Sequence, residues 1–179
     1  MPSRRRRTPS RSGRGTRRKL VWAQRSVSVA ATANNQYLNV DLLSEYKGAT
    51  GASSIGITIM RTHLWVLPHA PTAGDSIWLG LRIADLADVS AAFAASNALV
   101  SNPRDNAYVD WMFDQRYVYD VNLRVPTMHT DFAGAMVDLR AKRRMEEVQE
   151  AYVLTVVQDS VTTVAKTYDG FARTLLALP

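Results

Sequence analysis

Nine basic residues at the N-terminus are the stretch of this 179-residue sequence with the clearest chemistry. Residues 1–19, MPSRRRRTPSRSGRGTRRK, contain no acidic residue and carry Arg4, Arg5, Arg6, Arg7, Arg11, Arg14, Arg17, Arg18 and Lys19. A guanidinium group forms paired hydrogen bonds to a phosphate, and neutralising phosphates releases the counterions condensed on a nucleic acid. We therefore interpret residues 1–19 as a nucleic-acid-binding arm.

The charge of the chain is divided sharply between this arm and the remainder. The whole sequence carries a net charge of +6. The arm holds nine of the 22 basic residues, so the body keeps thirteen basic residues and all sixteen acidic ones, a net charge of −3. Between the arginines stand only Pro, Ser, Thr and Gly, which offer no apolar surface to offset the entropy of ordering. We expect a disordered arm. The alternatives are a solvated tail, or a nuclear localisation signal formed by the clusters at 4–7 and 17–19.

Nothing in the arm can read bases. It contains no aromatic residue, so the stacking that single-strand binders commonly use is missing. Binding through it should involve the phosphate backbone and be indifferent to sequence.

No arrangement of residues in the body predicts catalysis or a metal site. The chain lacks cysteine, and its three histidines, His63, His69 and His129, match no metal-binding spacing. Four acids in one aromatic stretch have the spacing of no known cation-binding loop: Asp105, Asp110, Asp114 and Asp120. No nucleophile elbow, Walker loop or dinucleotide fingerprint is present, so we expect neither an enzyme nor a cofactor.

The remaining residues, 20–179, have the length of one domain with a substantial core. The charged start is followed by no apolar segment typical of a secretory signal, and no run of about eighteen apolar residues is present. We expect a soluble protein with no membrane partner, divided into an arm (1–19) and a body (20–179).

Strand-like alternation begins directly after the arm. Residues 25–31 place Val27, Val29 and Ala31 on one face, and residues 37–40 can extend before a short helix capped by Asp41. The longest run, 55–67, would in a regular strand place its isoleucines on the face that carries Arg61, His63 and Trp65. It should end at Pro68. Residues 76–84 alternate again, with Ile77, Leu79, Leu81 and Ile83 inward, and are predicted to pair with 55–67 as antiparallel neighbours.

The second half of the chain mixes strands with two less regular segments. A short helix is predicted at 90–98, and the aromatic residues of 108–119 favour a sheet or a subunit interface, with Tyr108, Trp111, Phe113 and Tyr117 as candidate contacts. Residues 138–152 are compatible with a helix or with strand, charged turn and strand, and the β-branched stretch after 151 favours the second. Residues 161–178 are predicted to form a hairpin that turns at Asp169 and Gly170.

These segments total about eight strands with one or two short helices, which predicts an all-β sandwich or barrel. An Arg-rich arm before such a body resembles the coat proteins of small icosahedral viruses with a single jelly roll, including those of satellite viruses and circular single-stranded DNA viruses. The resemblance implies a two-sheet antiparallel sandwich and a closed shell of many copies. It also implies an arm that binds a single-stranded DNA or RNA genome inside the virion, with a stage in the nucleus where the host is eukaryotic.

One other class of binding protein remains open. A cellular single-stranded nucleic-acid-binding β-barrel with a basic tail would place basic and aromatic residues together on one sheet face. The negative charge of the body argues against that arrangement.

Overall fold

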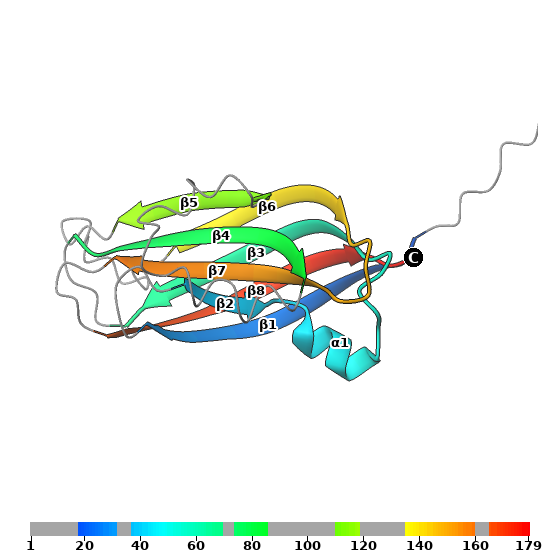
Figure 1. Ribbon diagram of the computed structural model, residues 1–179, viewed down its shortest axis with the longest axis horizontal. Helices are drawn as coiled ribbons and strands as arrows, with labels where there is room; N and C mark the ends of the chain where they lie inside the picture. The colour runs from blue at the N-terminus through cyan, green and yellow to red at the C-terminus, as the bar shows by residue number, and fades with distance from the viewer. Residues whose placement is uncertain (1–17, 32–36, 70–73, 86–109, 119–134, 160–164) are drawn as a thin grey trace, which may run out of the picture.

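The computed structural model describes residues 18–31, 37–69, 74–85, 110–118, 135–159 and 165–179. Within these ranges the chain forms one helix and eight strands (Figure 1). They are β1 (Leu20–Ala31), β2 (Tyr37–Asp41), α1 (Ser44–Thr50), β3 (Thr58–Pro68), β4 (Ser76–Asp85), β5 (Phe113–Val118), β6 (Ala135–Arg144), β7 (Glu150–Asp159) and β8 (Lys166–Ala177). The predicted helix at 90–98 lies outside the described residues.

The strands form two four-stranded sheets, with the orders β1-β8-β3-β6 and β2-β7-β4-β5. Every pairing is antiparallel, and the pairs are nested: β1 with β8, β2 with β7, β3 with β6 and β4 with β5. This nested pairing is the jelly roll, in which a long hairpin of strands is wrapped into two packed sheets. The predicted fold class, an all-β jelly-roll sandwich of about eight antiparallel strands, is confirmed.

The inner faces of the two sheets enclose one large hydrophobic core. Alternation decides which residues reach it, because successive side chains of a strand point to opposite faces. Val27 of β1 is 2% exposed, and the predicted inward residues Leu79 and Leu81 of β4 are both fully buried. The predicted inward face of residues 76–84 is therefore confirmed.

The prediction that residues 55–67 and 76–84 are neighbouring strands is wrong. β3 pairs with β6 and β8, whereas β4 pairs with β5 and β7 in the opposite sheet. Two consecutive amphipathic strands can bury their apolar faces by packing across a sandwich as well as by pairing side by side. Alternation alone does not distinguish these two arrangements.

A register shift in β3 brings both of its apolar sets into the core. The pairing with β8 passes from Ile59 opposite Leu176 to Arg61 opposite Leu175, so Met60 is an extra residue in the ladder. A β-bulge of this kind reverses the inside-outside alternation beyond it. Ile59 is therefore buried together with Leu64 and Val66, whereas the regular alternation predicted by the sequence would have separated them.

The predicted hairpin at 161–178 is also wrong, because Asp169 and Gly170 lie inside the continuous strand β8. A Cβ atom on Gly170 would lie 2.1 Å from the backbone oxygen of Trp65 on β3. Glycine is thus needed here for the close approach of two strands, and not for a turn.

The structure resolves the ambiguity at 138–152 in favour of strand, turn and strand. β6 continues to Arg144, farther than predicted, and β7 begins at Glu150. In the turn between them, Met145 is fully buried, and its N–H donates to the carbonyl of Ile57 at 2.8 Å.

Two buried tyrosines connect the sheets through the core. The hydroxyl of Tyr152 on β7 lies 2.8 Å from the hydroxyl of Thr62 on β3. The hydroxyl of Tyr168 on β8 donates to the side-chain oxygen of Gln158 on β7 at 3.2 Å. Burial raises the pKa of Tyr168 to about 12 and also raises that of Tyr152, whose bond to Thr62 partly opposes the shift. Each hydroxyl has a partner from the opposite sheet, as a buried polar group requires.

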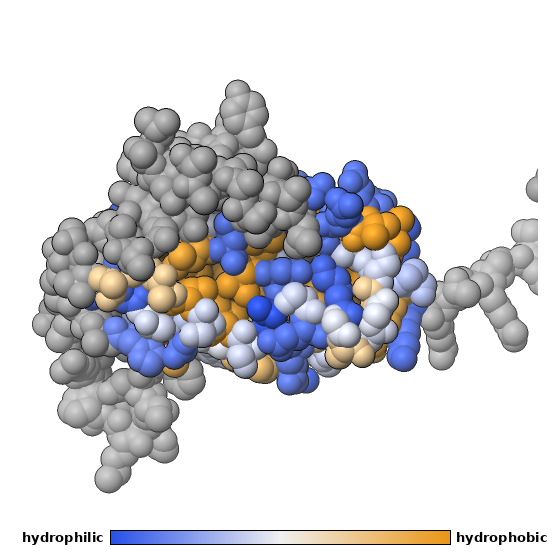
Figure 2. Space-filling model, turned by 60° about the horizontal axis from the view of Figure 1, so that its bottom comes forward, coloured by the Kyte–Doolittle hydropathy of each residue, from blue (hydrophilic) through white to orange (hydrophobic). Residues whose placement is uncertain are grey.

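The core is closed less completely along the side of β1 and α1. With this side turned forward, apolar residues occupy the middle of the surface and hydrophilic residues lie around them (Figure 2). Val29 of β1 and Val40 of β2 pack against the core but are only partly buried. β1 and β2 are edge strands of their sheets, and no further strand in the described part of the chain pairs with their free edges.

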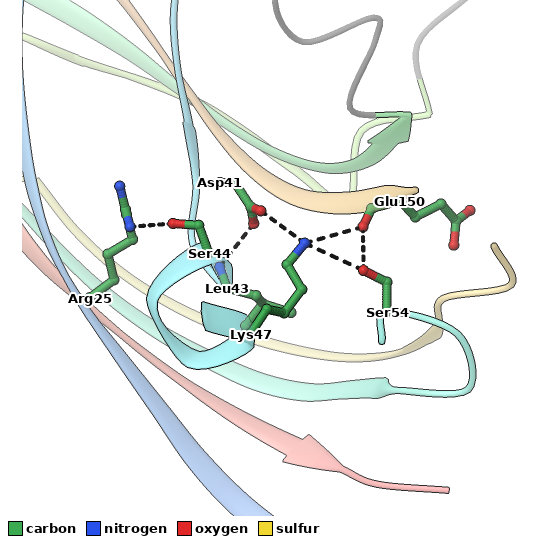
Figure 3. A network of polar contacts seen from close by, with 7 residues as sticks. All are labelled: Arg25, Asp41, Leu43, Ser44, Lys47, Ser54 and Glu150. Carbon is green, nitrogen blue, oxygen red and sulfur yellow. Dashed lines mark hydrogen bonds and ion pairs between the residues drawn. The ribbon is translucent and has the colours of Figure 1, made fainter. Parts of the chain in front are cut away.

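Helix α1 is held by a polar network centred on Lys47 (Figure 3). The Lys47 ammonium lies 3.0 Å from the Asp41 carboxylate and donates to the Ser54 hydroxyl at 3.3 Å. Asp41 also accepts the N–H of Leu43 at 2.9 Å, so it satisfies a donor before the helix, whose N-cap is Leu43, two residues later than predicted. At the other end of the network, Arg25 of β1 donates to Ser44.

Candidate nucleic-acid interface

The basic arm joins the body at one corner of the β1-β8-β3-β6 sheet. The carbonyl of Lys19 accepts the N–H of Leu178 at 2.8 Å, and Arg18 donates to the hydroxyl of Thr58 at 3.3 Å. These two are the members of the predicted arm that the structure describes. The other seven lie outside the described residues: Arg4, Arg5, Arg6, Arg7, Arg11, Arg14 and Arg17.

Beside this junction lies an open hollow of about 490 Å³ on the outer face of the sheet. It is lined by Arg18, Leu20, Thr58, Met60, Lys142, Arg144 and Ala177. Three of these residues are cationic and none is acidic, so the hollow has the charge of an anion-binding surface.

The strands of this outer face carry five basic residues, two of which also line the hollow. On β6, Ala135 and Val137 are buried, whereas the residues at the even positions 136 to 144 are exposed. The basic side chains at these even positions therefore point outward. The five basic residues are Arg61 on β3, Arg173 on β8, and Arg140, Lys142 and Arg144 on β6. Lys142 and Arg144 also line the hollow, so the charge continues from the arm junction across the sheet.

An aromatic cluster lies among these basic residues, formed by Trp22, His63, Trp65 and Phe171. Successive ring centroids are separated by 5.8 Å, 6.2 Å and 6.1 Å in that order. The guanidinium of Arg173 stands 4.4 Å from the centre of the Trp22 ring, a cation–π contact. Trp22 remains 36% exposed, which is unusual for a residue with so large an apolar surface.

Both acidic residues that point outward from the strands of this face accept hydrogen bonds from neighbouring side chains. Arg61 donates to the two oxygens of Asp138 at 2.8 and 2.6 Å, and this pair holds the pKa of Asp138 below its ordinary value. Hydrogen bonds from Ser28 and His69 lower the pKa of Asp169 in the same way. The four strands contribute five positive and two negative side chains to this face, a net +3 when His63 is neutral, and Arg18 of the arm adds one more positive charge.

The outer face of the other sheet is different in character. Its β4 residues Trp78, Arg82 and Ala84 are 6%, 5% and 9% exposed. The rings of Trp78 and Trp111 meet edge to face, with centroids 4.7 Å apart, above Gly80, where any Cβ would collide with both. One sheet therefore presents an open basic and aromatic face, whereas in the other the outward residues of β4 are buried and Arg116 of β5, opposite Trp78, is exposed.

The predicted interface aromatics have different surroundings. Tyr108 lies outside the described residues, and Trp111 packs on Trp78. Phe113 and Tyr117 are partly buried against the main core, and the Tyr117 hydroxyl donates to the carbonyl of Met136. Their role in subunit contacts stays a prediction, and Trp111 is the described member least engaged with the main core.

No group of three or more metal-ligating side chains occurs among the described residues. Of the four acids considered from the sequence, Asp110 forms an ion pair with Arg143, and Asp105 and Asp120 lie outside the described ranges. No helix in the described part of the chain is long and apolar enough to cross a membrane.

The basic and aromatic face was missed by sequence reasoning, which placed all the basic character in the arm. The net charge of a body says nothing about how its charges are distributed over its faces. A local signal was present: Arg61, His63 and Trp65 alternate on one strand, and Arg140, Lys142 and Arg144 alternate on another. That these strands are neighbours became clear only from the sheet order.

Comparison with known proteins finds distant likenesses in structure only. No protein-family model matches the chain, and no curated protein sequence is similar to it. The decameric capsid protein of BFDV is 9% identical with a TM-score of 0.42, covering 88% of this chain and 96% of that one. The Turnip yellow mosaic virus chain is 8% identical with a TM-score of 0.38, covering 100% and 91%.

The chain has a similarly weak structural similarity to a bacterial protein. Part of latent PorU from Porphyromonas gingivalis is 10% identical with a TM-score of 0.33, covering 87% of this chain and 10% of that one. At such identities and TM-scores, none of these likenesses bears on family or function.

Proposed function

We propose that this chain is the coat protein of a small icosahedral virus, which assembles into a closed shell and packages a single-stranded nucleic-acid genome. One observation carries the proposal: the Arg-rich arm joins the body at the corner of the open basic face, next to Arg18, Arg144 and Lys142. The basic face therefore lies on one side of a two-layered plate, and Arg18 and Lys19, the last residues of the arm, lie at its corner.

A plate with this polarity suits the wall of a container. If copies assemble with the basic face inward, the arms and the sheet faces concentrate positive charge in the interior, where it neutralises a polyanion. The opposite sheet would lie toward the exterior. In closed symmetric shells each copy uses the same surface patches, so the polarity of one subunit becomes the polarity of the whole.

The remaining parts of the proposal follow from these roles. Aromatic contacts between subunits would involve Trp111 first, since Phe113 and Tyr117 are already packed on the core. The partner is DNA or RNA and many copies of the chain, and the site of action is the virion. The arginine clusters of the arm would also serve nuclear import in a eukaryotic host. The proposal includes no catalytic step, cofactor or membrane.

Electron microscopy of the purified protein, with and without added single-stranded nucleic acid, tests the proposal. We expect closed particles of uniform diameter, and nucleic acid protected from nuclease inside them. A monodisperse monomer under every condition, still able to bind nucleic acid, would contradict the shell.

The second candidate is a cellular single-stranded nucleic-acid-binding module, which the structure favours more than the sequence did. Its supporting observation is the presence of Trp22, Trp65 and Arg173 on one exposed sheet face. Light scattering at rising protein concentration separates the two functions, because a binding module coats a strand without closing into a particle of fixed size.

A further inference from the structure

The aromatic cluster on the β1-β8-β3-β6 face belongs to none of the hydrophobic core clusters among the described residues. Its residues point away from the core, and four of the six exposed large hydrophobic residues among those described lie on the same face: Leu20, Trp22, Leu67 and Met136 are 59%, 36%, 37% and 58% exposed. All four lie on this one sheet face, whereas the described part of the opposite sheet has Trp78 buried at 6%. An exposed patch of this kind marks a binding surface.

We propose that this face is a second nucleic-acid site, at which unpaired bases of a single strand stack on Trp22, Trp65 and Phe171. The surrounding cations would hold the phosphates of the same strand. The inference deepens the proposed function and rests on it for the identity of the ligand, but its chemistry differs from that of the arm. The arm binds phosphate alone, and this face also binds bases.

The geometry of the cluster supports stacking because the rings are held in place by one another. His63 contacts Trp22 and Trp65 edge to face, at interplanar angles of 63° and 83°. Arg173 covers part of Trp22 from above, and it can also pair with a phosphate while remaining against the ring. Rings fixed in this way lose little conformational entropy when a base is added to them.

The positions of the cations indicate how a nucleic-acid strand would lie across the face. Arg140, Lys142 and Arg144 form a basic border on the edge strand β6, and among the described residues Arg140 and Lys142 take part in no ion pair within 4 Å. Arg173 adds a cation near the centre of the aromatic cluster. A backbone lying over β6 therefore places its bases toward β3 and β8, where Trp65 and Phe171 lie. Bases in a duplex are covered by their pairing partners and neighbours, so this mode of binding selects single strands.

The charge of the face also argues against a second copy of the same face as the occupant. Two copies meeting face to face would bring +3 against +3, and like charges at an interface oppose association. The arm begins at the corner of this face, at Arg18, so a strand held by the arm reaches the cluster without leaving the protein. Both observations favour a polyanion.

Fluorescence anisotropy with two labelled oligonucleotides tests the site in the full-length protein. One is an oligothymidylate of about 20 nucleotides, a length chosen to exceed the site size of a single binding domain. The other is an abasic strand of equal length, which presents the same phosphates without bases. The variants are Trp65→Leu, Trp22→Leu and, as a matched control, Val148→Ala, an apolar residue without a ring that is 64% exposed in the turn between β6 and β7.

We expect the wild-type protein to prefer oligothymidylate over the abasic strand, and the preference to persist at high salt, where phosphate contacts weaken. Each tryptophan variant should bind oligothymidylate about 5-fold more weakly or worse, as the loss of one stacked base implies, with little change for the abasic strand. Val148→Ala should bind both strands as the wild type does. Quenching of the wild-type tryptophan fluorescence by oligothymidylate, but not by the abasic strand, provides a readout that needs no variant.

Equal affinity for the two strands, or tryptophan variants that bind as the wild type does, would overturn this second site. A variant with Arg4 to Arg7 replaced by Ala keeps the two proposals separate, because it should weaken binding to both strands equally. If that variant binds normally, the arm's role fails while the stacking site stands. If sedimentation without nucleic acid shows self-association that Trp65→Leu abolishes, the face is a protein contact and the inference is wrong.

Discussion

Gly170 shows how a single residue decides whether two strands can pair closely. It lies in the middle of β8 opposite Val66, and a methyl group at its Cα would lie 2.1 Å from the Trp65 oxygen. Because that oxygen belongs to the backbone, the neighbour cannot rotate away. The strands would have to separate, with loss of hydrogen bonds on either side.

We therefore expect Gly170→Ala to lower the free energy of unfolding by about 2–4 kcal/mol, the range of severe packing and strain defects. Urea denaturation followed by circular dichroism measures the change. Gly48→Ala in α1 is the control, since no atom lies within 4 Å of its Cβ position, and alanine should be neutral or stabilise by up to about 1 kcal/mol. A Gly170→Ala protein as stable as the wild type would show that β3 and β8 can move apart freely.

The buried tyrosines predict how stability depends on alkaline pH. Their pKa values in the folded protein are raised from 10.0, to about 12 for Tyr168 and also upward for Tyr152, mainly by burial. Above pH 10 the unfolded chain loses these hydroxyl protons while the folded protein keeps them. Their contribution is therefore complete below pH 10 and is lost as the pH rises through about 10 to 12.

The double variant Tyr152→Phe/Tyr168→Phe should accordingly lose less stability than the wild type between pH values of about 9 and 11. At neutral pH it should be less stable by about 1–2 kcal/mol per hydroxyl, since Thr62 and Gln158 lose their partners. Urea unfolding across this range compares the two proteins. Parallel pH profiles would mean that these hydroxyls do not titrate in the unfolding reaction.

At the scale of elements, α1 depends on contacts outside the helix. It has seven residues, no buried side chain and no side-chain cap, and helices this short are unstable alone. Lys47 connects it to Asp41 at the end of β2 and, through the Ser54 hydroxyl and the Glu150 carbonyl, to the loop before β3 and the start of β7. These contacts position the helix against the sheet that contains β2 and β7, and the bond from Arg25 of β1 to Ser44 links it to the other sheet.

Lys47→Met should lower the free energy of unfolding by about 1–2 kcal/mol, because Asp41 loses its cation in a mostly buried position. Lys142→Met, on the exposed part of β6, removes the same charge and should change stability little. Thermal unfolding of the two variants provides the measurement. Equal effects would indicate that the network around α1 adds no more than a surface charge does.

At the scale of the whole molecule, the chain is a plate with two unlike sides and a polycation at one corner. The arm contributes nine charges, and each phosphate neutralised on a single strand changes the slope of log affinity against log salt by about −0.7. The arm alone should therefore give a slope of roughly −6 if every charge engages.

Replacing Arg4 to Arg7 by Ala leaves five charges in the arm, so the slope from the arm should fall to roughly −3.5. In assembled particles the length of packaged nucleic acid should decrease as well, while particle diameter stays the same. Binding titrations over a range of salt, with electron microscopy of the particles, measure both quantities. An unchanged slope and cargo length would show that the charge lies elsewhere, for example on the sheet face.

Local chemistry alone determined several features of this protein. The role of the basic arm stays a prediction, whereas most strands are recognisable because alternation requires only one buried face. For the same reason the inward residues of β4 and the strand, turn and strand at 138–152 could be predicted.

Only the tertiary structure decided which strands are neighbours, and with it the character of each face. Alternation is the same whether β3 and β4 pair or pack across a core, and a bulge at Met60 reverses it without any mark in the sequence. In the sequence, Gly170 after Asp169 is typical of a turn, and only the structure shows that glycine is needed there because the Trp65 backbone lies against it. The basic and aromatic face forms because nested pairing brings Trp22, Trp65 and Phe171, distant along the chain, onto one sheet. Contacts of this kind depend on long-range strand order, which no local pattern encodes.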